Sequence, residues 1–486
     1  MYIRNEDTIC APATVPGTGA ISVIRVSGPE ALTIADKVIT CRKGSIGEAP
    51  GYTIKFGNIY DASGALLDEV LASVFHAPHS YTGENSVEIS CHASSYIVSA
   101  VMDLLYAAGC RAAEPGEFTQ RAFLNGKMDL AQAEAVADVI ASQNAAAHRI
   151  AFKQMKGGFS SELKGMRSEL LELVSLMELE LDFSEEEVEF ADRTRLNQLL
   201  TALIAHVSRL IDSFKLGNAI KNGVPVAIAG ATNTGKSTLL NALLGEDRAI
   251  VSDVHGTTRD TVEETLNIDG VLFRFIDTAG LRETEEIVEK IGIERTFKKI
   301  GEASIILGMV DLTRDFDSTC ETIREIVEKV EFTTQKLVFL LNKTDICEVN
   351  KNVNIVNYIV SSLDNKDIKA SLVENTADAS DFTPIIGISA KTGSGIDNLR
   401  SILATSQRDL LADSDTTLVT NQRHVQALSD ARTSLLRVQE GLAFGLPTDL
   451  AAQDIREAIY HLGSIVGEIS TDEVLGNIFR NFCIGK

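Results

Sequence analysis

Long apolar runs are missing from this chain of 486 residues. A membrane-spanning helix needs about 20 consecutive, mainly apolar residues, and the uninterrupted apolar runs here are far shorter. The first residues, MYIRNEDTICAP, contain no long apolar segment of the kind found in a secretory signal. We therefore expect neither a membrane span nor a secretory signal.

Paired cysteines are also missing. The seven cysteines are scattered and form no C-x-x-C pair: Cys10, Cys41, Cys91, Cys110, Cys320, Cys347 and Cys483. An odd, scattered set argues against a disulfide framework and against a zinc site. It indicates a reducing compartment, and we expect a cytoplasmic protein.

Positive charge is scarce, since 45 lysines and arginines stand against 68 acidic residues and give a net charge of −23. Such a surface disfavours non-specific binding of polyanions by the protein as a whole. A nucleic-acid partner would therefore need a local basic groove, or a partner protein that supplies the positive field.

The length exceeds what one hydrophobic core can hold, and two to four domains are expected. Residues 1–120 mix β-branched runs with Gly and Pro turns and are typical of an α/β region. Residues 121–218 have a pattern typical of helices. There, Asp129 followed by Gln132 forms a capping-box pattern at a helix start.

A long amphipathic helix is predicted after this start. Its apolar residues recur at steps of three and four: Leu163, Met166, Leu170, Leu173, Val174 and Met177. Residues 219–402 then alternate apolar runs with helical stretches, which predicts βαβ units and a mostly parallel sheet. Residues 403–486 again have a pattern typical of helices. The simplest architecture is an α/β domain inserted into a discontinuous helical domain.

A phosphate-binding loop is predicted at Gly230–Ser237, where GATNTGKS fits the pattern G-x-x-x-x-G-K-[ST]. A predicted strand precedes it and a predicted helix follows. Glycines let such a loop wrap phosphates with backbone N–H groups, Lys236 can reach the β and γ oxygens, and Ser237 can offer a hydroxyl to Mg²⁺.

Companion motifs follow in the order that a GTPase needs. In Asp277-Thr278-Ala279-Gly280 the carboxylate can hold the magnesium shell, and the Gly280 N–H can meet the γ-phosphate. Between this motif and the phosphate loop lies GTTRD (residues 256–260), in which Thr258 is a candidate Mg²⁺ ligand.

Two further motifs predict the base. The Asp345 carboxylate of Asn342-Lys343-Thr344-Asp345 can accept two hydrogen bonds from guanine, whereas adenine lacks that donor pair. The segment Ser389-Ala390-Lys391 can support the base with a main-chain N–H. Together the motifs predict a guanine nucleotide site and disfavour ATP.

One expected element is absent. Many small GTPases carry Gln directly after D-x-x-G to position water, but Leu281 stands there. Another residue must orient the nucleophile. The candidates are Asn233 and an acidic string whose alternative reading is a solvated helix face: Glu283, Glu285, Glu286 and Glu289.

The sequence resembles the MnmE (TrmE) family of tRNA-modifying GTPases over nearly its full length. The resemblance is carried by DTAGLRETEEIVEKIGIERT, GATNTGKSTLLNALLG, GTTRD, DTICAPATVPGTGAISVIRVSG, SYTGENSVEISCH, PGEFTQRAFLNGKMDLAQAEAVADVI and the terminal FCIGK.

This resemblance implies an N-terminal α/β domain (1–120) that binds formyltetrahydrofolate and mediates homodimerisation. It implies a discontinuous helical domain (121–218 and 403–486) with a C-terminal cysteine motif, and an inserted Ras-like P-loop G domain (219–402). Potassium would stimulate GTP hydrolysis. With a flavoprotein partner, MnmG (GidA), the protein would install an aminomethyl or carboxymethylaminomethyl group at C5 of the wobble uridine of certain tRNAs, using a folate one-carbon unit. The alternative is a GTP-dependent switch that gates a partner enzyme without covalent chemistry of its own.

The resemblance also implies roles for single residues. Potassium ligands fall on Asn233, Ser252, Val254 and Thr257, magnesium ligands on Ser237 and Thr258, and the water-orienting carboxylate on Glu289. Folate contacts fall on Arg25, Glu88, Lys127 and Lys486. The wider nucleotide set adds Thr234, Gly235, Lys236, Thr238, Asp277, Thr278, Ala279, Gly280, Asn342, Lys343, Asp345, Ser389, Ala390 and Lys391. Whether Cys483 attacks the uridine, or completes a site that another protein uses, stays open.

Overall fold

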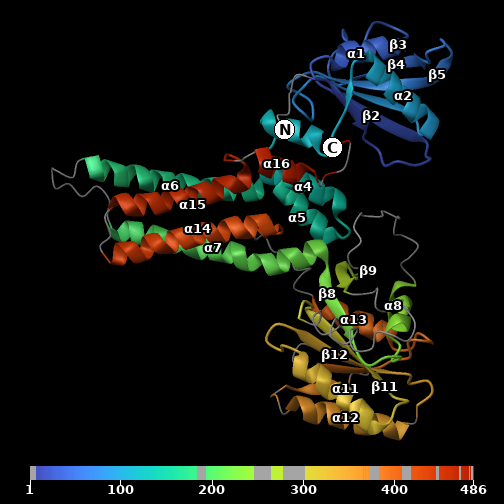
Figure 1. Ribbon diagram of the computed structural model, residues 1–486, viewed down its shortest axis with the longest axis vertical. Helices are drawn as coiled ribbons and strands as arrows, with labels where there is room; N and C mark the ends of the chain where they lie inside the picture. Colours follow the sequence, from blue (N-terminus) through green and yellow to red (C-terminus); the bar gives the residue numbers. More distant parts are fainter. Residues whose placement is uncertain are drawn as a thin grey trace. The chain divides into compact units, whose positions relative to one another are not determined.

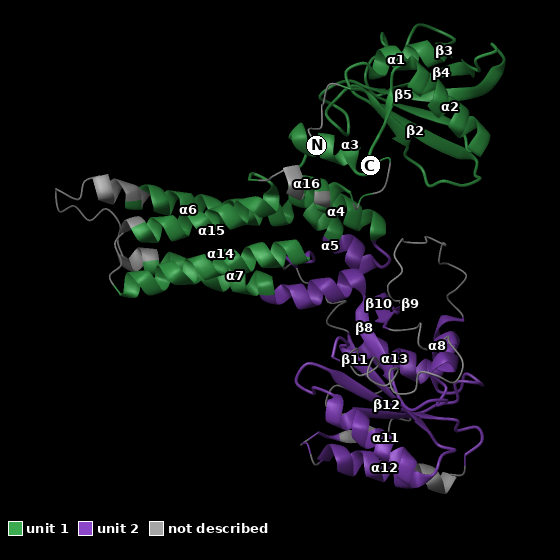
Figure 2. Ribbon diagram, viewed as in Figure 1, with its two compact units in different colours: residues 1–141, 151–211, 422–486 green, residues 142–150, 212–421 purple. Residues whose placement is uncertain are grey.

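The computed structural model contains two compact units, each with its own core (Figures 1 and 2). It describes residues 7–182, 193–245, 264–276, 301–347, 349–364, 366, 368–372, 383–407, 417–444, 448–469, 472–480, 482 and 485. Unit 1 comprises Met1–Ala141, Ala151–Ile211 and Gln422–Lys486, and unit 2 comprises Ser142–Ile150 and Asp212–Asn421. No helix among the described residues is long and apolar enough to cross a membrane.

Unit 1 begins with a seven-stranded sheet in the order β3-β4-β5-β6-β2-β1-β7. The strands are β1 (Ile9–Pro12), β2 (Ile21–Ser27), β3 (Ile39–Cys41), β4 (Thr53–Tyr60), β5 (Leu66–Phe75), β6 (Ser86–His92) and β7 (Arg111–Ala112). Neighbouring strands are antiparallel except for β1 and β7, which are parallel.

The two faces of this sheet differ because side chains alternate along each strand. Ile24 and Val26 of β2 point into a core that is closed by helices α1 (Ala31–Val38) and α2 (Ser95–Ala108). The other face carries Arg25 together with large exposed apolar side chains: Ile21, Ile54, Phe56 and Leu71. One face of the sheet is therefore covered by helices, and the opposite face presents apolar side chains to solvent.

Helices make up the rest of unit 1. They are α3 (Glu117–Leu124), α4 (Leu130–Ala141), α6 (Gly158–Asp182), α14 (Gln422–Ala443), α15 (Thr448–Val466) and α16 (Asp472–Phe479), while α5 (Ala145–Met155) and α7 (Arg193–Asn222) have residues in both units. Helix α15 packs against α14 and α6 (Figure 1).

The predicted capping box and amphipathic helix are both confirmed. The Asp129 N–H donates to Gln132 Oε1, and the Gln132 N–H donates to Asp129 Oδ1, each at 3.0 Å. All six apolar side chains that defined the amphipathic helix are buried along α6. Local patterns were sufficient here, because each feature lies within a single stretch of helix.

A buried ionic cluster joins the early and late helices of unit 1. Glu134 of α4 accepts hydrogen bonds from Arg423 Nε and Nη2 (3.0 and 2.9 Å) and lies 2.6 Å from His424 Nε2, both on α14. Arg423 also donates to the carbonyls of Ser464 and Ile465 at the end of α15. The cluster thus holds α4, α14 and α15 together. Most of unit 2 lies between α4 and the other two helices in the sequence.

Unit 2 is built on a second seven-stranded sheet in the order β13-β14-β12-β11-β8-β10-β9. Its elements are β8 (Val224–Ala229), α8 (Lys236–Leu244), β9 (Glu264–Ile268), β10 (Val271–Phe275), β11 (Ile305–Asp311), α11 (Phe316–Lys329), β12 (Lys336–Asn342), α12 (Val349–Asp364), β13 (Ala370–Leu372), β14 (Thr383–Gly387) and α13 (Ile396–Ser406). Every neighbouring pair is parallel except β9 and β10, so the predicted mostly parallel sheet is confirmed.

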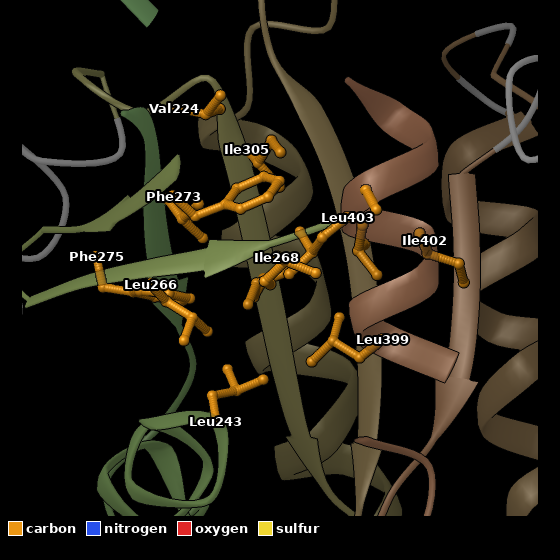
Figure 3. Packing of buried hydrophobic residues seen from close by; sticks show 14 of the residues in the cluster. Val224, Leu243, Leu266, Ile268, Phe273, Phe275, Ile305, Leu399, Ile402 and Leu403 are labelled. Atoms are coloured by element: carbon orange, nitrogen blue, oxygen red, sulfur yellow. The ribbon is translucent and has the colours of Figure 1, made fainter. Parts of the chain in front are cut away.

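Both faces of this sheet are covered. Figure 3 shows one face, where Leu243 of α8 and Leu399 of α13 pack towards Phe273 and Ile305 of the strands. On the other face Ile323 of α11 and Ile359 of α12 join a separate core cluster with the strands. Burial on both sides explains why these strands were apolar runs rather than alternating patterns. The carboxyl ends of the parallel strands meet at one edge, where the predicted motifs that follow β8, β12 and β14 lie.

Candidate functional site

The predicted phosphate loop connects β8 to α8 and has room only for glycine at two positions. Gly230 has φ +156°, and a Cβ there would lie 2.4 Å from the carbonyl oxygen of Met309. Gly235 has φ +98°, and a Cβ there would lie 2.5 Å from Asn342 Nδ2. Between them Asn233 has φ +61°, a left-handed conformation that asparagine tolerates better than most residues. The loop therefore has the tight curvature that lets backbone N–H groups face a phosphate.

Lys236 is folded back onto its own loop. Its Nζ donates to the carbonyls of Gly230 and Ala231, both at 2.8 Å. Burial, reinforced by the nearby charge of Arg314, lowers the pKa of Lys236 to about 8. Thr234 is buried, whereas the side chains of Ser237 and Thr238 in the first turn of α8 are exposed. A bound phosphate would offer this lysine a stronger acceptor than two neutral carbonyls.

Asn342, at the end of β12, joins three of the predicted motifs. Its Nδ2 donates to the carbonyl of Thr234 at 2.7 Å, and its Oδ1 accepts from the Ala390 N–H at 3.0 Å. Asn342 is buried, so both bonds are shielded from water. One side chain thereby fixes the phosphate loop and the loop after β14 relative to each other.

The remaining base-recognition residues are close to Asn342 in the sequence or lie in the loop after β14. Lys343 has φ +69° and its Nζ lies 2.7 Å from Asp311 Oδ2, while the side chains of Asp345 and Lys391 are exposed. Ser389 is buried and its N–H donates to the carbonyl of Ser394. The Asp345 carboxylate is thus open to a ligand at the edge where Asn342 and Ala390 meet.

Sequence reasoning did not single out Asp311 and Arg314, which extend this site. Burial would raise the pKa of Asp311, but hydrogen bonds from Lys343 and Thr313 outweigh it and hold the pKa below its usual range. The Arg314 guanidinium donates to the carbonyl of Thr232 in the phosphate loop. The only available sequence signal was an acidic residue at the end of an apolar strand on the same sheet edge. The loop after β11 therefore connects the base motif with the phosphate loop.

The other predicted nucleotide, metal and catalytic residues lie outside the described residues. They are Ser252, Val254, Thr257, Thr258, Asp277, Thr278, Ala279, Gly280, Glu289 and Cys483, together with Lys486 of the predicted folate set.

Arg25 and Glu88, two of the predicted folate residues, are direct partners across β2 and β6. Arg25 Nη2 lies 2.9 Å from Glu88 Oε1, and the guanidinium lies over the rings of Tyr81 and Phe118, at 4.9 and 5.5 Å from their centroids. Both side chains project from the face of the sheet opposite α1 and α2. The pair combines charge, hydrogen-bonding capacity and aromatic surface in one place.

Lys127 approaches the same region from the end of α3. Its Nζ donates to the carbonyl of Pro78 at 2.9 Å, and its stem lies beside Gly83. Tyr81, which stacks with Arg25, belongs to this same loop between β5 and β6. The structure therefore brings Arg25, Glu88 and Lys127 around one loop.

A buried arginine that the sequence analysis missed supports that loop. Arg121 of α3 is fully buried and forms ion pairs with Asp7, Glu84 and Glu117 at 2.6, 3.2 and 2.9 Å. In sequence it reads as an ordinary charged residue of a helix. Its partners come from three separate segments, so it fixes α3 against the loop that carries Tyr81.

Comparisons with known proteins match the whole chain. The model of the GTP-binding protein TrmE N-terminus matches residues 8–127, and the model of the MnmE helical domain matches residues 130–483. The protein named tRNA modification GTPase MnmE from Bacteroides thetaiotaomicron is 51% identical over 484 residues, which cover 99% of this chain and 100% of that one. The protein of that name from Flavobacterium johnsoniae is 49% identical over 99% and 100% of the two chains.

A solved structure of Era in complex with MgGDPNP and ribosomal RNA is 26% identical over 43% of this chain and 66% of that one. Its TM-score of 0.26 is too low to establish a shared overall fold. The family models and the full-length relatives carry the assignment instead, because they cover the N-terminal sheet and the helices as well as the nucleotide loops. This chain belongs to the MnmE family of tRNA modification GTPases.

Proposed function

We propose that this protein is a potassium-stimulated GTPase that acts with a flavoprotein, MnmG (GidA), on C5 of the wobble uridine of certain tRNAs. The product would carry an aminomethyl or carboxymethylaminomethyl group. The observation that carries the proposal is the pair of hydrogen bonds made by the Asn342 side chain, one to the phosphate loop and one to the loop after β14. A guanine nucleotide needs these two loops to be held together, because one binds its phosphates and the other its base. The scattered cysteines support a cytoplasmic location for this activity.

In this proposal the domains divide the work. Residues 219–402 bind and hydrolyse GTP, and residues 1–120 bind the folate and form the homodimer. Residues 121–218 and 403–486 make up the helical domain, which carries the C-terminal cysteine motif. The helices that belong to unit 1 on both sides of unit 2 in the sequence support a discontinuous domain.

GTP would lie along the carboxyl edge of the second sheet. The phosphates would replace the carbonyls of Gly230 and Ala231 as acceptors for Lys236. Asp345 would accept the two guanine N–H donors, and the loop of Ser389, Ala390 and Lys391 would line the base.

The proposal includes two cations at this loop. The exposed Ser237 hydroxyl suits Mg²⁺, for which Thr258 is the second proposed ligand. The exposed Asn233 carboxamide suits K⁺, which would be shared with Ser252, Val254 and Thr257. A monovalent cation beside the bridging oxygen can stabilise negative charge that develops there during hydrolysis. Glu289 would orient the water.

The open face of the N-terminal sheet supports both the folate site and the homodimer. Glu88 can accept paired N–H donors of a pterin ring, while Arg25, Lys127 and Lys486 supply positive charge for its carboxylates. The exposed apolar side chains Ile54, Phe56 and Leu71 on the same face suit a second copy of this chain, because an apolar sheet face is stabilised by being covered.

The experiment compares GTP turnover in K⁺ and in Na⁺ at equal ionic strength. We expect faster turnover in K⁺, and we expect Asn233→Ala to remove most of the difference. Equal turnover of the wild-type protein in the two salts would refute the cation assignment.

A Cys483→Ser variant then separates covalent chemistry from gating. Loss of tRNA modification with normal GTP turnover supports a chemical role for the thiol. Modification that persists at the wild-type rate favours the alternative, in which GTP hydrolysis gates the partner enzyme.

A further inference from the structure

Gly485 touches the N-terminal sheet at a point where only glycine fits. Gly485 is buried and has φ +97°. A Cβ on Gly485 would lie 2.2 Å from the carbonyl oxygen of Pro12 and 3.1 Å from Ala13 Cα. Both obstacles are backbone atoms at the end of β1, so neither can swing aside. The backbone of Gly485 therefore lies directly against the backbone at the end of this strand.

A second glycine contacts residues shortly before Gly485 in the sequence. Gly116, just before α3, has φ +70°, and a Cβ there would lie 2.6 Å from the carbonyl oxygen of Phe479 and 2.9 Å from Phe482 Cβ. Phe479 is buried beside Leu130, and its ring meets the Phe482 ring edge-on with centroids 5.3 Å apart. Phe479 at the end of α16 and Phe482 thus pack against each other and against the Gly116 backbone.

Both contacts adjoin the residues that hold Arg25. Ala11, next to Pro12, is the register partner of Arg25 across β1 and β2. Phe118, whose ring lies under the Arg25 guanidinium, follows Gly116 by two residues on α3. Each glycine contact therefore lies within two residues of a neighbour of Arg25, a residue of the proposed folate site.

We propose that Gly116 and Gly485 are positioning residues that clamp the C-terminal segment beside Arg25. A misplacement of about 1 Å can cost a reaction about 100-fold. The clamp would hold Phe482 and Gly485, the described residues on either side of Cys483 in the sequence, beside the folate site during the tRNA reaction. This role rests on the proposed function, whereas the docking of the segment can be measured without it.

The test uses Gly485→Ala and Gly116→Ala in the full-length protein. Hydrogen exchange of the C-terminal peptide, followed by mass spectrometry, reports whether the segment remains docked. We expect exchange to accelerate at least about tenfold in each variant, because a left-handed alanine and a backbone clash both oppose docking. In the same variants tRNA modification with the flavoprotein should fall about tenfold, while GTP turnover stays at the wild-type rate.

Two controls match these changes. Gly64→Ala places alanine at φ +86° with no atom within 4 Å of its Cβ, so it carries the conformational strain without the clash. Gly476→Ala adds a methyl group to α16 itself, again with nothing within 4 Å. Both should leave the exchange of the C-terminal peptide and the tRNA modification unchanged.

The proposal is wrong if the C-terminal peptide of Gly485→Ala exchanges hydrogen at the wild-type rate. It is also wrong if a variant with accelerated exchange of this peptide modifies tRNA at the wild-type rate. If Gly116→Ala fails to fold, Gly485→Ala decides alone, since Gly485 lies outside every helix and strand that the structure describes in unit 1. If the wild-type pair does not modify tRNA, the proposed function fails, and the exchange measurement still decides whether the glycines dock the segment.

Discussion

Glu134 provides the sharpest prediction on stability, because its carboxylate is buried and holds helices from distant parts of the sequence together. Burial would raise its pKa, but His424 and then Arg423 outweigh that effect and lower the pKa from 4.5 to about 2. A shift of this size corresponds to about 3 kcal/mol in favour of the folded state. The pKa is depressed in the folded protein, so this stabilisation is present above about pH 4.5 and is lost as the pH falls towards 2.

The perturbation is Glu134→Gln at pH 7. It keeps the size of the side chain but leaves Arg423 and His424 without their carboxylate. We expect the opening free energy of α4 and α14 to fall by about 3 kcal/mol, which makes their backbone amides exchange about 100-fold faster. Native-state hydrogen exchange measures this opening directly, and it does not require the whole protein to unfold in a single step.

The matched control is Asp454→Asn. Asp454 pairs with Arg437 at 3.0 Å, but the arginine side chain is 46% exposed, so the loss should stay below about 1 kcal/mol. If Glu134→Gln accelerated exchange no more than this control, the claim that the cluster stabilises the helical part of unit 1 would be wrong.

Two further predictions concern the nucleotide site. Asn342→Ala removes two buried hydrogen bonds between loops and should weaken GTP binding by about 10- to 100-fold in calorimetry; a loss below threefold would contradict its joining role. Burial lowers the pKa of Lys236 to about 8, so above that pH GTP phosphates should bind with proton uptake and with an affinity that falls as the pH rises. Calorimetry at pH 8.5 in two buffers of different ionisation enthalpy measures the uptake, and identical binding heats would refute it.

The features that the sequence predicted well are those that depend on neighbouring residues. The Asp129–Gln132 capping box and the amphipathic face of α6 each lie within a few turns. The parallel sheet of unit 2 could be predicted because strands that are buried on both faces appear in the sequence as continuous apolar runs. In β11, for example, all seven residues are buried.

The features that it missed depend on distant partners. Arg121 has the sequence context of a helix surface, yet it is fully buried because Asp7 and Glu84 reach it from other segments. Asp311 looked like the polar end of a strand, and its bond to Lys343 requires two strands to be placed side by side. Such pairs are decided by the topology of the sheet, which no local pattern of residues contains.

The Glu134 cluster also bears on how the chain is made. Glu134 and Arg423 are 289 residues apart, and a ribosome that adds 5–20 residues per second needs roughly 15 to 60 s to synthesise that interval. All strands of the second sheet, and α13 that covers it, emerge within this time, so unit 2 can complete its core first. Until α14 has been synthesised, the Glu134 carboxylate on α4 remains hydrated. This charge helps to keep the exposed surface of the incomplete helical part of unit 1 soluble. The late arrival of α14 then buries the charge and completes the helical assembly as one of the final events of synthesis.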